Sequence, residues 1–190
     1  MKKGIYYEFI AFLCDKAYAM PLGILYYDKP IFYVYKSTTM AKLLNLNKDT
    51  SNSIYLLSPN DPTLFLESLE HRIENRIIHN NKCLDFDDKL GSWYYCNSYI
   101  NKDHCDKYEF YCDNFYKIKG ENIPYSRSYG CLIELLILLT KVKAGIKEQW
   151  FLNYASGLKW CVERSSNKDE KYVELSEKLL QMLRKHLEES

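Results

Sequence analysis

The chain has 190 residues, 47% of them hydrophobic, and a formal net charge of +1 at pH 7. A chain of this length and composition can bury enough apolar surface to offset its conformational entropy, which excludes intrinsic disorder. The near-neutral charge excludes a charge-driven grip on nucleic acid or on a membrane surface, so we expect neither as a partner.

The β-branched and aromatic residues gather in runs that are typical of strands, at 5–14, 17–27, 31–36, 53–57 and 83–118. The first three runs are separated by short turns, at Asp15-Lys16 and at Asp28-Lys29-Pro30. Strands joined by such short turns pair antiparallel. The first part of the chain therefore predicts an antiparallel meander.

Helical spacing appears first at 37–46, after a Ser-Thr-Thr cluster that is suited to N-capping. A second helix is predicted to start at Asp61-Pro62, because Asp favours the N-cap and Pro the first turn. Its apolar face would consist of Leu66, Leu69, Ile73 and Ile77.

The last third of the chain predicts three helices, at 126–142, 149–160 and from Asp169 to Glu188. The first of them would bury Leu132, Leu135, Leu136 and Leu139. The last would bury Val173, Leu180 and Leu187, with Leu179 and Leu183 beside them. The expected fold is α+β, with an antiparallel barrel carrying short helices at 1–118 and a helical region at 119–190.

The N-terminal apolar run does not predict a signal peptide, because Glu8 interrupts it and Asp15 and Lys16 end it. No run is long and uncharged enough to span a bilayer. We therefore expect a cytoplasmic protein. Without an export signal, the odd number of 7 cysteines favours reduced thiols.

A metal site is the weaker alternative. Its best ligand set is Cys96, His104, Cys105 and Cys112, whose spacing fits no standard zinc pattern. The four histidines form no metal set or catalytic triad in the sequence, and no dinucleotide-binding glycine motif, P-loop or nucleophile elbow occurs.

The segment around Ser37, Thr38 and Thr39 places three hydroxyls where a strand passes into a short helix, with Lys42 one turn further on. The free N–H groups of a helix start, together with hydroxyl donors and a lysine, can bind a phosphate. The alternative interpretation is that these residues only cap the helix.

Three other features allow a functional and a structural interpretation. Met20-Pro21 and Gly23 interrupt a strand, which indicates either a bulge or the close approach of a flat ligand. Arg127 stands in the first turn of the strongest helix, where a cation opposes the helix dipole, so it would pair with a carboxylate or a phosphate. Glu134 has no cation one turn away and either faces water or pairs with another element or subunit.

Taken in order, these segments resemble the domain-of-unknown-function family 447, known mainly from archaea, which has an FMN-binding split-barrel fold. The matching pieces are Tyr7-Glu8-Phe9-Ile10, Ala19-Met20-Pro21-Leu22-Gly23-Ile24, Tyr35-Lys36-Ser37-Thr38-Thr39 with Leu43, Asp61-Pro62-Thr63-Leu64-Phe65, and the segment from Tyr125 to Glu134 that ends near Thr140-Lys141. The last piece is the most specific, and together they cover most of the chain. The sequence departs from the family pattern at Lys42, Ser126 and Lys141.

The resemblance implies that FMN binds at a homodimer interface, with its phosphate held by Ser37, Thr38 and Thr39. It also implies that the flavin ring lies against strands of the barrel, near Met20 and Pro21. Lys42, Arg127 and Glu134 complete the predicted cofactor-binding set.

The leading hypothesis is a flavin-dependent oxidoreductase whose substrate the sequence does not identify, since the cofactor would carry the chemistry. The alternative is a dimeric split-barrel interaction module that does not use FMN. Both hypotheses expect a homodimer.

Overall fold

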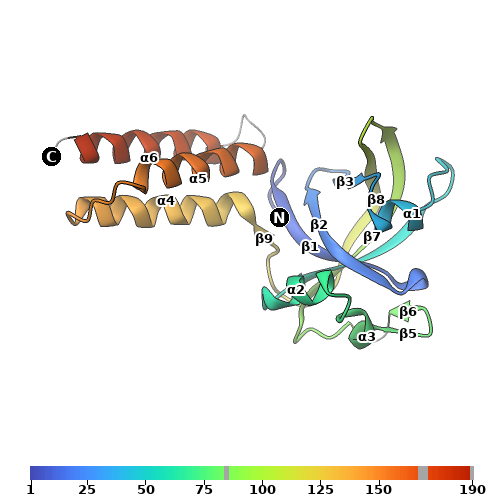
Figure 1. The fold of residues 1–190 in the computed structure, drawn as a ribbon. Helices are drawn as coiled ribbons and strands as arrows, with labels where there is room; N and C mark the ends of the chain where they lie inside the picture. The colour runs from blue at the N-terminus through green and yellow to red at the C-terminus, as the bar shows by residue number, and fades with distance from the viewer. Residues whose placement is uncertain (84–85, 167–170, 189–190) are drawn as a thin grey trace. The chain divides into compact units, whose positions relative to one another are not determined.

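The structure is a computed structural model that describes residues 1–83, 86–166 and 171–188, and it divides into two compact units (Figure 1). The first unit comprises Met1 and Tyr7–Tyr125, and the second comprises Lys2–Tyr6 and Ser126–Ser190. The second unit therefore contains segments from both ends of the chain.

The first unit is built on a closed antiparallel barrel of six strands. These are β1 (Tyr6–Leu13), β2 (Tyr18–Leu25), β3 (Ile31–Tyr35), β4 (Asn52–Pro59), β7 (Gly91–Asp103) and β8 (Lys107–Lys119). They pair in the order β2-β3-β8-β7-β4-β1, and a further pairing of β2 with β1 closes the barrel. A two-residue strand, β9 (Tyr125–Ser126), lies beside β1. The predicted α+β class with an antiparallel barrel is confirmed.

The barrel core follows from the alternation of side chains along each strand. In β3, Phe32 and Val34 are buried, and Phe32 stacks on Phe110 of β8 with 5.2 Å between the ring centroids. Trp93 of β7 is fully buried and packs on Phe12 of β1. The aromatic residues that predicted the strands therefore also fill the barrel.

Short elements connect the barrel strands. They are the 3₁₀ helix η1 (Cys14–Lys16), α1 (Thr39–Leu43), α2 (Thr63–Leu69), α3 (Glu74–Ile77) and the small hairpin formed by β5 (Ile78–His79) and β6 (Lys82–Cys83). The turn after η1 is completed by Ala17 in the left-handed conformation, with φ 48°. The predicted turn at Asp15-Lys16 thus separates β1 from β2.

The prediction of one continuous helix after Asp61-Pro62 is wrong. The helix α2 ends at Leu69, and the chain turns at His71, whose φ of 56° is incompatible with a right-handed helix. Leu66 and Leu69 are consequently exposed, whereas Ile73 and Ile77 are buried next to and within the separate helix α3.

The expectation of reduced thiols is wrong for four of the seven cysteines, because disulfides join Cys14 to Cys83 and Cys96 to Cys112. The fold brings the Cα atoms of these pairs to 5.3 and 5.4 Å, which is within disulfide range although the partners lie 69 and 16 residues apart. The alternative zinc site loses two of its ligands to the second bond. No group of three or more potential metal ligands occurs among the described residues.

The second unit packs three helices, α4 (Arg127–Lys143), α5 (Phe151–Ser165) and α6 (Lys171–Glu188). Its core contains Leu132, Leu135, Leu138, Leu139, Val142, Phe151, Ala155, Leu158, Val162, Leu179, Leu180 and Leu183. Leu136, predicted on the buried face of α4, is instead 40% exposed. The predicted start of the last helix at Asp169 lies outside the described residues.

The N-terminal segment joins this unit through an antiparallel bridge between Ile5 and Ser166. Both residues are buried. In the part of the chain that the structure describes, none of the helices has the length and apolar character needed to cross a membrane.

Removing either disulfide should lower the free energy of unfolding. The chain-entropy estimate is about 4 kcal/mol for Cys14→Ala/Cys83→Ala and about 3 kcal/mol for Cys96→Ala/Cys112→Ala, because the first bond closes the longer loop. Urea unfolding followed by tryptophan fluorescence would measure both losses. A variant that unfolds at the same urea concentration as the unmodified protein would contradict the corresponding bond.

Candidate functional site

The predicted phosphate-binding segment forms the turn between β3 and α1. Thr38 is the N-cap of α1, and its Oγ1 accepts a hydrogen bond from the backbone N–H of Ala41 at 3.3 Å. The same hydroxyl donates to the carbonyl oxygen of Tyr35 at 2.7 Å. The hydroxyl hydrogen of Thr38 is therefore used within the turn, as the capping interpretation expects.

The other predicted residues of this turn are at the surface. Ser37, Thr39 and Lys42 are all exposed, and Lys42 lies in the last turn of the five-residue helix α1. The Ser37 hydroxyl and the Lys42 ammonium group are thus available to an anion in solution.

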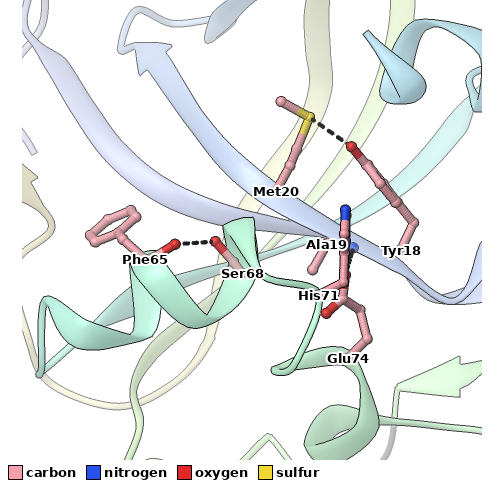
Figure 2. Close-up of polar contacts among 7 residues, drawn as sticks. All are labelled: Tyr18, Ala19, Met20, Phe65, Ser68, His71 and Glu74. Atoms are coloured by element: carbon pink, nitrogen blue, oxygen red, sulfur yellow. Dashed lines mark hydrogen bonds and ion pairs between the residues drawn. The ribbon is translucent and has the colours of Figure 1, made fainter.

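Tyr18 connects this turn to β2. Its phenol donates a hydrogen bond to the sulfur of Met20 at 3.9 Å and shares a hydrogen bond with the side chain of Thr39 (Figure 2 shows the contact with Met20). Burial raises the pKa of the Tyr18 phenol, the hydrogen bond with Thr39 lowers it, and the nearby Glu74 carboxylate raises it, with a net increase. Met20 and Thr39, two of the predicted site residues, thus both contact the side chain of Tyr18.

The apolar part of the predicted set lies on the same strand. Met20 and Pro21 are adjacent in β2, and both side chains are half-buried. Pro21 has no N–H to offer to a neighbouring strand. A flat apolar ligand could therefore contact this part of β2 without competing for a backbone donor at that position.

Glu74 of α3 fixes the backbone of β2 next to Tyr18. Its Oε1 accepts a hydrogen bond from the N–H of Ala19 at 3.1 Å and lies 2.9 Å from Nδ1 of His71 (Figure 2). The Glu74 side chain is only 8% exposed, and its Oε2 is buried with no hydrogen-bond partner in the described part of the chain. A buried carboxylate is costly unless its hydrogen bonds compensate, so this contact is a strong local constraint.

His71 lies between this carboxylate and the phenol. Its ring centroid is 5.6 Å from that of Tyr18, and its Nδ1 faces Glu74. Tyr18, His71 and Glu74 were not among the residues predicted from the sequence. The three-residue spacing of His71 and Glu74 could have suggested their pairing, but no sequence pattern links them to a strand more than fifty residues earlier.

A polar cavity of about 770 Å³ lies elsewhere in the first unit. The Cys14–Cys83 disulfide forms part of its wall, together with Leu43 and Leu44 at the end of α1. None of the predicted cofactor-binding residues lines it. The cavity and the Tyr18 cluster are therefore separate features.

Arg127 and Glu134, the remaining predicted residues, belong to α4 in the second unit and are exposed. Both act electrostatically on Cys131 between them, Arg127 lowering and Glu134 raising the pKa of its thiol. The structure thus brings these two residues together around a cysteine.

Comparisons with known proteins give matches to solved structures. No family model and no curated protein matches the sequence. A solved structure that is similar to this chain is an FMN-bound protein from Methanosarcina mazei, described as belonging to the family model DUF447. It is 14% identical, the match covers 98% of this chain and 96% of that one, and the TM-score is 0.43.

Replacing Glu74 should test the anchoring of β2. Glu74→Ala leaves the buried N–H of Ala19 without an acceptor and should lower the free energy of unfolding by about 2 kcal/mol. Glu74→Gln keeps an acceptor oxygen and should cost less than about 1 kcal/mol. Chemical denaturation would measure both values.

The matched control is Glu67→Ala, which removes a carboxylate of α2 that forms an ion pair with Arg76 nearer the surface. Such pairs contribute about 0–1 kcal/mol. An equal loss in Glu74→Ala and Glu67→Ala would contradict the anchoring role.

Proposed function

We propose that this protein binds FMN beside Tyr18, between β2 and the β3–α1 turn. The observation that carries the proposal is the pair of contacts from the Tyr18 phenol to Met20 and Thr39. The family resemblance assigns the first of these residues to the flavin ring and the second to the phosphate. Their adjacency supports a single ligand that reaches both.

The residues present fit the two ends of FMN. Ser37 and Lys42 offer exposed hydroxyl and ammonium donors to the phosphate, and a lysine can meet it as a point charge. The Thr39 hydroxyl links this turn to Tyr18. Met20 and Pro21 offer half-buried apolar surface to the ring. Thr38 contributes by capping α1, since its hydroxyl hydrogen is donated to Tyr35.

Bound FMN would supply hydride or electron transfer, so the proposed activity is that of an oxidoreductase. The protein's own residues would hold and orient the cofactor. The roles of Arg127 and Glu134 in cofactor binding stay predictions that rest on the family resemblance.

Oxidoreductase activity predicts that a reduced nicotinamide bleaches the absorption band of the bound flavin under anaerobic conditions. A band that no reductant of this class bleaches would count against this activity.

The phosphate assignment predicts a selective loss of affinity. In Ser37→Ala/Lys42→Ala, the dissociation constant for FMN should rise by about tenfold or more, because two donors to the phosphate are lost. The affinity for riboflavin, which has no phosphate, should not change. Quenching of flavin fluorescence during titration would measure both constants.

Two further variants serve as controls. Lys48→Ala/Thr50→Ala removes one exposed lysine and one exposed threonine outside the turn and should leave FMN binding unchanged. Thr38→Ser keeps the capping hydroxyl and should do the same. Equal FMN affinity in Ser37→Ala/Lys42→Ala and the unmodified protein would refute the assignment.

The predicted homodimer is supported by an exposed apolar stripe on α4. Tyr129, Ile133, Leu136 and Ile137 recur at helical spacing, and each is at least 39% exposed. A contiguous apolar surface of this kind is typical of protein contacts. We therefore propose that two copies of the chain associate through α4.

The substitution Leu136→Glu should convert the dimer into a monomer, because it places a charge in the middle of the apolar stripe. Light scattering coupled to size exclusion would measure the mass. Ile146→Glu, which makes the same kind of change at another exposed position, should leave the dimer intact. Identical masses for the unmodified protein and Leu136→Glu would contradict this interface.

The alternative function, a dimeric module that does not use FMN, has a distinct outcome. A colourless dimer that retains no FMN after desalting and shows no binding in titration would favour it. The exposed apolar stripe on α4 supports this alternative, because a dimer interface does not require a cofactor.

A further inference from the structure

Two thiols face each other in the helical unit. Cys131 of α4 and Cys161 of α5 are each half-buried, and their sulfur atoms are 2.8 Å apart. The helices that carry them belong to one packed core, in which Leu132 and Leu135 lie close to Cys131 along α4. The pair is therefore held in register by the surrounding side chains.

The surroundings give the two sulfurs different roles. Cys131 donates its S–H to the sulfur of Cys161, which also lies 4.0 Å from Oγ of Ser165. Burial, followed by the hydrogen bond with Cys161, raises the pKa of the Cys131 thiol to about 12. Cys131 is thus protonated near neutral pH, and its S–H points at the sulfur of Cys161.

The other cysteines are arranged differently. Four are already joined in the two disulfides of the barrel unit, and Cys105 is exposed and has no cysteine partner among the described residues. The seven cysteines therefore sort into three pairs and one single thiol. Only the Cys131–Cys161 pair is reduced in this structure.

We propose that Cys131 and Cys161 form a redox-active dithiol site whose substrate is a low-molecular-weight disulfide. The sulfur of Cys161 attacks one sulfur of the substrate, so that a mixed disulfide forms and the first substrate thiol leaves. The sulfur of Cys131 then attacks Cys161, the protein disulfide closes, and the second substrate thiol leaves with the proton from Cys131. Two protein thiols are oxidised to one disulfide while one substrate disulfide is reduced to two thiols.

This proposal is independent of FMN binding. It rests on the distance between the sulfurs, their partial exposure and the rigid packing of α4 and α5. It also gives Arg127 and Glu134 a role as charges on either side of a reactive pair.

The test uses the full-length protein and oxidised glutathione as the disulfide. Thiols are counted with a maleimide after denaturation, and the cysteines are assigned by peptide mapping. We expect three free thiols to fall to one on treatment, with two glutathione molecules released and a new link between Cys131 and Cys161. Protein isolated with that link closed should release both thiols on treatment with reduced glutathione, because the exchange is reversible.

Single substitutions identify the order of attack. Cys131→Ser should stall with glutathione attached to Cys161, and Cys161→Ser should prevent the closure of a disulfide. Cys105→Ser, at the exposed single thiol, should leave the reaction of the pair unchanged. Circular dichroism of each variant separates a loss of reaction from a loss of fold.

Two results would overturn the proposal. One is a protein in which Cys131 and Cys161 stay free while Cys105 accepts glutathione. The other is glutathione attached separately to Cys131 and to Cys161 with no link between them, since that would mean that the sulfurs do not meet.

Discussion

The closure of the barrel through β2 is the constraint on which the candidate site depends. This strand pairs with β1 on one side and β3 on the other. This pairing fixes which side chains of β2 point into the barrel and which point outward. A shift of one residue would exchange these faces and move Tyr18 and Met20 into the core. The hydrogen bond from the N–H of Ala19 to the buried carboxylate of Glu74 holds the strand at the same place from outside the sheet.

The two halves of the proposed cofactor site are therefore positioned by different interactions. Pairing within the sheet sets the apolar surface of Met20 and Pro21, and the capping hydrogen bonds of Thr38 shape the turn that presents Ser37 and Thr39. Tyr18 contacts a residue from each half. Its phenol is thus the natural place to look for a change in environment when a ligand binds.

Most of the barrel was predictable from the sequence because aromatic and β-branched residues mark its strands, and Thr38 was predictable as a cap from its hydroxyl and position. The helix after Asp61 was mispredicted because apolar spacing cannot reveal that His71 adopts a left-handed conformation. The disulfides and the contact of Glu74 with Ala19 join residues that only the folded chain brings together. The Cys131–Cys161 pair was not predicted for the same reason, since the two cysteines lie on two different helices and share no sequence motif.

The bridge between Ile5 and Ser166 has a consequence for the way the chain is built. Because residues 2–6 belong with the helices, the barrel sequence is inserted into the helical unit rather than placed before it. During synthesis the barrel strands leave the ribosome long before the helices that the N-terminal segment must join. That segment cannot form its bridge until Ser166 has been synthesised, so the helical unit is completed by residues from both ends of the chain.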